Sequence, residues 1–332
     1  MNQKVIILLL FVSAGLLSAC TKTGDDDLPA DIPVADFDKT WSVVDEWYPY
    51  LEYKKIDWDQ VYDVYYPQIT SSHVDEYLPV INQMLLELKD GHVGVYLTNG
   101  TVWGYRTPRQ IKDENSFDFS VTEKYLTEAV HSLENGKLQY GLISEIGYIR
   151  ISTFSGYGGL VNMDVIFHEL RNTSGLIIDV RHNGGGNSEN AGFVVSRCIQ
   201  EPLPTPGWTE KGLFKNGPTL QPNLTDNYSN TIVVLVNGKS FSTTEHFIMW
   251  MQQTEKTTIV GDTTGGGSGN PLMFSLPSGN QIRVSTRFFY RYDGEPIECN
   301  GIVPDILVGQ NASDIQAGTD KQLEAALEFL QK

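Results

Sequence analysis

The chain contains few cysteines, and its basic residues are fewer than its acidic ones. Cysteine occurs three times in 332 residues, as Cys20, Cys198 and Cys299, and no histidine stands at metal-ligand spacing from them. We therefore expect no metal site and no cofactor. The 24 Lys and Arg residues are outnumbered by 41 Asp and Glu residues, which gives a formal net charge of −17. This excess of negative charge argues against nucleic acid and anionic membrane surfaces as partners.

Long apolar runs are also rare, and the one present lies at the N-terminus. Lys4 precedes an apolar stretch at residues 5–17, and Leu17-Ser18-Ala19-Cys20 follows it. This pattern predicts a signal peptide at residues 1–19. The LSAC sequence resembles the bacterial lipobox, which implies lipidation of Cys20 and an envelope lipoprotein on the periplasmic or surface face of the outer membrane. A free cysteine after a plain signal peptide is the alternative.

The rest of the N-terminal third is predicted to be a tether followed by helices. Residues 20–35 include Asp25-Asp26-Asp27 and two prolines, and read as a polar tether that leaves the lipid anchor as the only membrane contact. Aromatic and aliphatic residues then recur at three- and four-residue steps up to residue 89, which predicts an N-terminal helical domain at residues 36–92. Its second helix is expected to stop near Pro67. If Cys20 is lipidated, Cys198 and Cys299 form one disulfide or stay as two thiols, and both remain open.

Strands and helices alternate from residue 147 onward. Strands are expected at residues 148–151, 175–180, 231–236 and 257–260, with helices at 160–170, from 188, and at 242–252. This order predicts an α/β domain at residues 93–332 with parallel βαβ units. Residues 100–141 are harder to interpret, although 117–119 look β-like. In parallel sheets, sites form at the carboxyl ends of strands.

Two such strand ends carry unusual residues. The strand at 232–236 leads through Asn237-Gly238 to Ser240 and Ser242 at the start of an apolar helix. Such a turn can hold a nucleophilic hydroxyl beside the positive end of a helix, although an ordinary N-cap would look alike. The other strand leads to Gly184-Gly185-Gly186, which matches no phosphate-loop pattern and can instead offer N–H groups to an oxyanion. No G-x-S-x-G elbow is present, which disfavours an α/β-hydrolase esterase.

At this point the sequence resembles the C-terminal-processing (tail-specific) serine peptidases. The resemblance rests on ordered blocks that are specific as a set: LKDGH at 88–92, DVRHNGGG at 179–186, VLVNGKSFSTTE at 234–245, VGDTTGG at 260–266 and ECNGIVPDI at 298–306. It implies a crotonase/ClpP-like βαβ catalytic domain with Ser242 as nucleophile and a peptide or protein as substrate. Ser240 is the nearby competitor. The segment between His92 and Gly147 is short for an inserted PDZ domain.

The chain departs from the best-known members where they carry a lysine base, since the matching position is Gly267 and Lys256 is not a positional match. It is therefore more similar to the tricorn-core and interphotoreceptor-retinoid-binding-protein-like branch. That resemblance implies His92 as the base and Glu298 as the acid that orients it. Gly91 stands where that branch has a serine, which leaves its four-residue network incomplete.

The chemistry required of each residue supports the same assignment. A serine needs a base, which an imidazole supplies near neutral pH, and a carboxylate can set the imidazole tautomer. The N–H groups of Gly185 and Thr243 could form the oxyanion hole. Glu295 is a rival for the role of Glu298.

Two functions therefore remain as hypotheses. The first is a serine endopeptidase that acts through an acyl-enzyme. The second is a silent protein that binds peptides or an apolar ligand on the same scaffold, as the missing lysine would allow. Glu245 is expected to support the Ser242 turn, whereas Asp179, Arg181 and Asn183 are expected to be structural.

Overall fold

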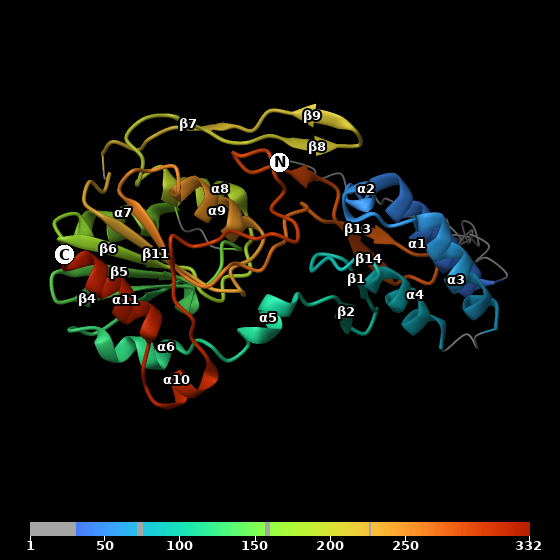
Figure 1. Cartoon of the computed structure of the whole chain (residues 1–332), viewed down its shortest axis with the longest axis horizontal. Coiled ribbons are helices and arrows are strands. Elements are labelled where there is room, and N and C mark those ends of the chain that lie inside the picture. The colour runs from blue at the N-terminus through green and yellow to red at the C-terminus, as the bar shows by residue number, and fades with distance from the viewer. Residues whose placement is uncertain (1–30, 72–75, 157–159, 226) are drawn as a thin grey trace, which may run out of the picture.

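The chain folds into two lobes joined across a central loop region (Figure 1). The computed structural model describes residues 31–71, 76–156, 160–225 and 227–332. The predicted signal peptide, Cys20 and residues 20–30 of the predicted tether lie outside these ranges. The α/β class and the helical N-terminal part are both confirmed.

The helical lobe consists of four helices packed on one four-stranded antiparallel sheet. Its elements are α1 (Ile32–Trp47), α2 (Leu51–Lys54), α3 (Trp58–Ser71), α4 (Tyr77–Leu86), β1 (Gly94–Tyr96), β2 (Val102–Gly104), β13 (Leu272–Ser275) and β14 (Gln281–Val284). The sheet order is β13-β14-β1-β2. Aromatic and aliphatic residues of the helices share one buried core with Val95, Ile282 and Val284. The strand that follows His92 is thereby held inside this lobe.

Two features of the helical lobe differ from the sequence prediction. Helix α1 begins at Ile32, because Asp31 caps it by accepting from the Val34 N–H, so residues 32–35 are helical. Helix α3 continues through Pro67 to Ser71. Pro67 removes only the backbone donor that would bond to the Asp63 carbonyl, and the helix persists for one more turn beyond it.

The α/β lobe is built on a seven-stranded sheet with the order β16-β12-β11-β6-β5-β4-β3. The strands are β3 (His131–Leu133), β4 (Leu138–Ile143), β5 (Ile146–Ile151), β6 (Gly175–Asp179), β11 (Ile232–Val236), β12 (Thr257–Gly261) and β16 (Ile306–Leu307). Strands β5, β6, β11, β12 and β16 run parallel, whereas β3 and β4 are antiparallel to their neighbours. The parallel centre is buried on both faces, as its continuous apolar sequence requires.

Helices cover both faces of this sheet (Figure 1). One face carries α7 (Leu160–Leu170), α8 (Ser188–Val195) and α9 (Thr243–Met251) over the largest core. The other carries α6 (Phe119–Thr122) and α11 (Lys321–Leu330). The β-like reading of residues 117–119 is wrong, because Asp118 caps α6 by accepting from the Ser120 N–H. The remaining short helices are α5 (Pro108–Lys112), α10 (Ala312–Gln316), η1 (Glu123–Tyr125) and η2 (Glu134–Gly136).

A long hairpin from the α/β lobe reaches the helical lobe (Figure 1). Its strands are β7 (Leu203–Pro204), β8 (Trp208–Glu210), β9 (Leu213–Lys215) and β10 (Thr219–Leu220), and β8 also pairs with β15 (Phe288–Phe289). At its tip, Lys211 lies 2.5 Å from Glu46 of α1. This exposed ion pair adds little stability by itself.

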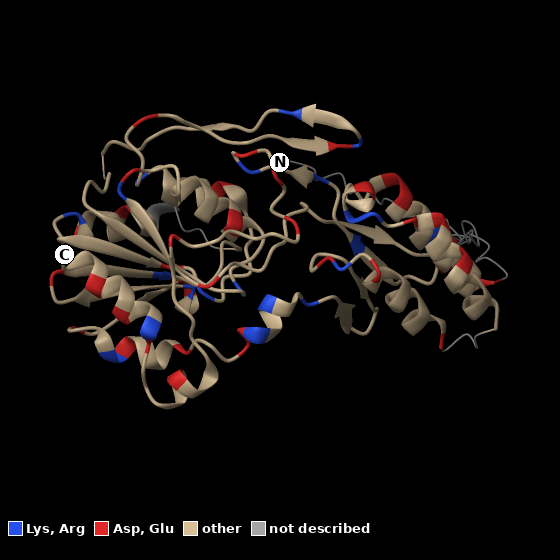
Figure 2. Ribbon diagram, viewed as in Figure 1, with Lys and Arg blue, Asp and Glu red and all other residues tan. Residues whose placement is uncertain are grey.

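Charged residues are spread over both lobes, with Asp and Glu on helices of each (Figure 2). Within the part of the chain that the structure describes, no helix has the length and apolar content needed to cross a membrane.

Candidate active site

Ser242 lies at the N-terminus of α9, just after the turn that follows β11. Its backbone has φ 60° and ψ −126°, a conformation that residues other than glycine rarely adopt. The Ser242 N–H donates to the Gly267 carbonyl and to the Glu245 carboxylate, both at 3.1 Å. Glu245 is fully buried and also accepts from the N–H groups of Gly266 and Gly267. Glu245 therefore stabilises the strained turn, as the sequence predicted.

The structure brings His92 to Ser242. The Nε2 atom of His92 lies 2.8 Å from the Ser242 Oγ, within hydrogen-bond distance. The imidazole is 4% exposed and stacks on the ring of Phe241 with a centroid distance of 4.7 Å. Ser242 itself is partly exposed. A hydroxyl open to solvent and held against a buried imidazole is the arrangement that general-base activation of a serine requires.

The carboxylate next to the other imidazole nitrogen belongs to Asp90, which the sequence reasoning missed. Its Oδ1 lies 3.7 Å from the His92 Nδ1 and accepts from the His92 N–H at 2.7 Å. Nδ1 has no hydrogen-bond partner among the described residues, so a small ring movement would let it donate to Asp90. Burial raises the pKa of Asp90, but the nearby His92 and Lys54 outweigh it, and the pKa lies well below its usual value. Asp90 stands two residues before His92 in LKDGH, a spacing that could have indicated it.

Glu298 lies in a different place from the one the sequence implied. Its Oε1 is 2.6 Å from the Nζ of Lys54, and its Oε2 accepts from the Ser268 N–H at 3.4 Å. No contact joins Glu298 to the imidazole of His92. The prediction that Glu298 orients this imidazole is therefore corrected, because the carboxylate beside Nδ1 is that of Asp90. Burial and the charge of Asp90 raise the pKa of Glu298 to about 8, against the opposing effect of Lys54. No local pattern singles out Lys54, since it lies 244 positions from Glu298.

The two predicted oxyanion donors differ in availability. The Thr243 N–H is at the first position of α9 and has no acceptor among the described residues. Gly185, at φ +98°, lies against it: a carbon added at Gly185 would come within 2.9 Å of the Thr243 nitrogen and 2.8 Å of the Ser242 Cβ. The Gly185 N–H, however, already donates to Asn183 Oδ1 at 2.9 Å. Thr243 is therefore the open donor, and Gly185 is shared with Asn183.

The ring of Phe241 fills the space beside both Gly91 and Gly267. A side-chain carbon at Gly267 would come within 2.2 Å of this ring, and one at Gly91 within 2.8 Å. These two glycines thus make room for one aromatic ring. The ammonium group of Lys256 donates to the Tyr228 carbonyl.

The competitors considered for the site are held elsewhere. Ser240 is fully buried and donates to the Val180 carbonyl, so it is unsuited to attack a substrate. Glu295 is exposed and its backbone pairs with Arg291. Asp179 and Arg181 form a fully buried ion pair at 2.6 Å that also engages Asp320 of the C-terminal segment, in keeping with a structural role.

Neither remaining cysteine is in a disulfide: Cys198 is buried and Cys299 is exposed. Among the residues that the structure describes, no cluster of His, Cys, Asp or Glu is suited to hold a metal ion.

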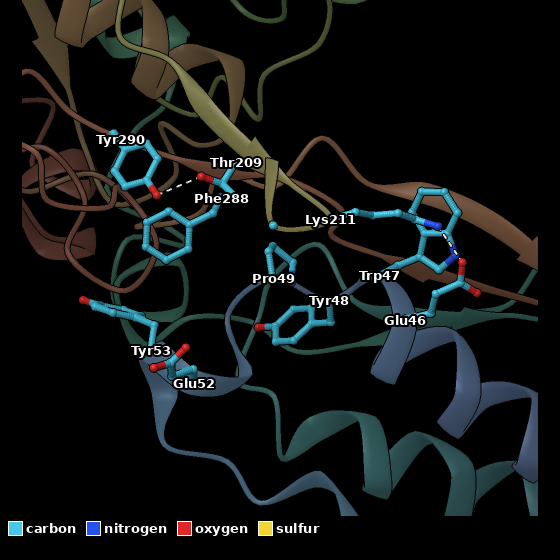
Figure 3. Close-up of a pocket in the computed structure, with 11 residues that line it drawn as sticks. Glu46, Trp47, Tyr48, Pro49, Glu52, Tyr53, Thr209, Lys211, Phe288 and Tyr290 are labelled. Atoms are coloured by element: carbon cyan, nitrogen blue, oxygen red, sulfur yellow. Dashed lines mark hydrogen bonds and ion pairs between the residues drawn. The ribbon is translucent and has the colours of Figure 1, made fainter. Parts of the chain in front are cut away.

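A cavity of about 670 Å³ lies between the α1–α2 corner and the β8–β9 hairpin (Figure 3). Its walls combine aromatic residues, among them Trp47, Tyr53 and Phe288, with polar and charged ones. The ring of Tyr48 also lines it, and the Tyr48 hydroxyl accepts from Lys54 at 2.9 Å. Through Tyr48 the cavity is therefore linked to Lys54, which pairs with Glu298.

Comparisons with known proteins identify the family of the chain. The profile of peptidase family S41 matches residues 145–308, and that of the tricorn protease C1 domain matches residues 33–86. A solved structure of a candidate peptidase from Parabacteroides merdae superposes with a TM-score of 0.80 at 30% sequence identity. That superposition covers 90% of this chain and 97% of the other.

Two curated relatives are processing proteases. The carboxyl-terminal-processing protease of Synechocystis sp. is 30% identical over 196 residues, and the carboxy-terminal-processing protease of Bartonella bacilliformis is 27% identical over 193 residues. Each alignment covers 56% of this chain and 44% of the relative, so the chain spans less than half the length of these two proteins. Taken with the near-complete structural match at 30% identity, these findings place the chain in peptidase family S41, a family of serine-type peptidases.

Proposed function

We propose that this chain is a serine endopeptidase that cleaves peptide bonds in peptides or proteins through an acyl-enzyme. The observation that carries the proposal is the 2.8 Å contact between the His92 Nε2 and the Ser242 Oγ. It is supported by the family membership of the chain and by the names of its relatives.

In the first half of the reaction, the Ser242 Oγ attacks the carbonyl carbon of the scissile bond and its proton passes to the His92 Nε2. The carbonyl oxygen becomes an oxyanion, which the unpaired Thr243 N–H stabilises, together with Gly185 if its N–H turns away from Asn183. The tetrahedral intermediate then collapses. The C–N bond breaks, His92 returns the proton to the leaving amine, and the acyl group stays on Ser242.

In the second half, His92 takes a proton from a water molecule that attacks the acyl carbon. The ester bond to Ser242 breaks and the proton returns to its oxygen, so that the free enzyme is restored and a new carboxyl terminus leaves. Among the groups of the enzyme, only the Ser242 hydroxyl and the His92 imidazole change their covalent state, while the oxyanion donors form hydrogen bonds.

We assign the orienting role to Asp90. For Nε2 to accept the serine proton, the neutral imidazole must carry its hydrogen on Nδ1, and Asp90 is the carboxylate beside Nδ1. Because its pKa is lowered, Asp90 is ionised at neutral pH and stabilises the imidazolium that forms. Glu298 contributes indirectly, through Lys54 and Ser268.

A silent binding protein is not favoured as an alternative. A scaffold that had lost catalysis would be free to lose the nucleophile–base contact, the strained Ser242 backbone and the open Thr243 N–H. All three are present together.

The proposal extends to location: the chain is an envelope lipoprotein anchored through a lipid on Cys20. The LSAC sequence after an apolar segment supports this part. Growth of expressing cells with labelled palmitate tests it, since label should enter the wild-type chain and not the Cys20→Ser variant.

A fluorophosphonate probe tests the catalytic part. The probe should label the purified wild-type chain, and both Ser242→Ala and His92→Ala should abolish labelling. Ser240→Ala is the matched control, because it makes the same chemical change two residues away and should leave labelling intact. Labelling that persists in Ser242→Ala would overturn the proposal.

A further inference from the structure

The turn that carries His92 is held by a basic side chain from the helical lobe. The Nζ of Lys54, the last residue of α2, donates to the carbonyls of Leu88 at 2.8 Å and Lys89 at 3.4 Å. These carbonyls directly precede Asp90-Gly91-His92, and we call residues 88–92 the His92 turn. Lys89 has φ 47°, so the turn contains a strained position that needs external support.

Lys54 also reaches the α/β lobe. Its Nζ lies 2.6 Å from Glu298, whose other oxygen accepts from the Ser268 N–H. Ser268 follows Gly267, the residue whose carbonyl accepts from the Ser242 N–H. One ammonium group therefore links the turn that holds the base to the loop that holds the nucleophile. Tyr50, just before α2, reinforces this link by donating from its hydroxyl to the Ser268 carbonyl.

Burial makes this contact electrostatically important. The side chains of Lys54 and Glu298 are 7% and 1% exposed, and Asp90 is fully buried. The groups that face the ammonium are the carboxylates of Asp90 and Glu298, the rings of Tyr48 and Tyr50 within 5.7 Å, and Cys299. The Asp90 and Glu298 carboxylates raise the pKa of Lys54, although burial acts against them. Lys54 is thus a buried cation between two buried acids, and removing it leaves both without its charge.

We propose that Lys54 is a positioning residue of the active site, which clamps the His92 turn and aligns Asp90 with the imidazole. This inference rests on the proposed peptidase function and deepens it. A second cation, Arg283 of β14, completes the clamp by donating to the His92 carbonyl at 2.6 Å and to the Gly91 carbonyl at 3.4 Å. The helical lobe thereby takes part in forming the site.

The test compares Lys54→Met, which removes the charge at similar length, with Lys54→Arg, which keeps it. For Lys54→Met we expect kcat on a peptide substrate, and the rate of fluorophosphonate labelling, to fall at least about tenfold while KM changes less than about twofold. The acid limb of the pH–rate profile should also move to higher pH. Loss of the ammonium raises the pKa of Asp90, because it removes a nearby positive charge that favours the ionised carboxylate. Lys54→Arg should keep the wild-type acid limb.

Matched controls separate positioning from general loss of stability. Lys39→Met removes an exposed lysine of the same lobe and should leave the rate and the acid limb unchanged. Lys54→Met/Glu298→Gln should be no slower than Lys54→Met, since Glu298 acts through Lys54. The melting temperature of each variant identifies any that fails to fold. If Lys54→Met fails to fold, Lys54→Arg is the variant compared with the wild-type chain.

The outcomes also separate this inference from the proposed function. If the wild-type chain is labelled but Lys54→Met matches it in rate and acid limb, the positioning role is refuted while the peptidase stands. If the wild-type chain is not labelled at Ser242, the peptidase fails. In that case the ¹⁵N resonances of His92 decide the inference: the Nδ1–H tautomer should predominate in the wild-type chain and lose population in Lys54→Met, and an unchanged tautomer would overturn it.

Discussion

The imidazole of His92 and the hydroxyl of Ser242 are in contact at 2.8 Å, although 150 positions separate them in the chain. His92 comes from a turn of the helical lobe and Ser242 from the start of α9 in the α/β lobe. The site therefore lies where the two lobes meet, and each lobe supplies one half of the proton transfer. The predictions below follow from this arrangement.

Asp90 should matter more to catalysis than Glu298. Asp90→Asn removes the charge beside Nδ1 and favours the wrong tautomer of His92, so we expect kcat/KM to fall on the order of 10³- to 10⁴-fold. Glu298→Gln should cost much less, because Glu298 does not contact the imidazole. Steady-state kinetics on a peptide substrate measure both, with the exposed Glu295→Gln as control. A larger loss in Glu298→Gln than in Asp90→Asn would restore Glu298 as the orienting acid.

Gly185 should tolerate no side chain, whereas its neighbour Gly184 should. A carbon at Gly185 would come within 2.8 Å of the Ser242 Cβ and would strain a backbone at φ +98°, while nothing lies within 4 Å of the same atom at Gly184. We expect Gly185→Ala to lower fluorophosphonate labelling by about 10²-fold or more, by displacing the nucleophile from its oxyanion donors. Gly184→Ala should be labelled at close to the wild-type rate. Equal rates for the two variants would contradict the placement of Gly185 against Ser242.

Gly267 should be required for packing. An added methyl group would meet the Phe241 ring at 2.2 Å, and overpacking of this kind typically costs about 1–3 kcal/mol of unfolding free energy. Urea unfolding of Gly267→Ala should show that loss, whereas Gly309→Ala, where the added carbon meets nothing, should not. Gly267→Lys should likewise fail to restore activity to His92→Ala. Recovery of labelling in that double variant would show that Phe241 can yield to a lysine.

His182 and His246 should each lower the stability of the chain as the pH decreases below about 6.5, an effect that the raised pKa of Glu298 opposes in the same range. Burial lowers the pKa of His246 to about 4, aided by His92, and burial together with Lys239 lowers that of His182 to about 4. Because the unfolded chain binds these protons near pH 6.5 and the folded chain does not, the stability is present above 6.5 and is lost towards pH 4. Each histidine contributes up to about 1.4 kcal/mol per pH unit in that window.

Urea unfolding between pH 6.5 and 5 measures this dependence. The His182→Gln/His246→Gln variant should show a flatter slope than the wild-type chain. The attribution fails if the two slopes are the same.

Local features of the fold followed from sequence because their causes are local. Short continuous apolar runs identified β6 and β11, and longer apolar segments identified α7 and α9, to within a few residues. Pro67 and residues 117–119 were misread, because a helix can continue past a lost donor and a single cap can override a β-like composition. His92, Ser242 and Thr243 were found from their motifs and the resemblance. The roles of Asp90 and Lys54, and the free state of Cys198 and Cys299, were not predicted from the sequence.

The sequence by itself determined most of the strands and helices and the turn that carries Ser242, because propensity, turn chemistry and motif order act between near neighbours. Only the tertiary structure decided which carboxylate faces His92, that Glu298 pairs with Lys54 across 244 positions, and that one Phe241 ring lies against both Gly91 and Gly267. Those choices depend on distances and desolvation between residues far apart in the chain. Such quantities exist only once the lobes have packed together.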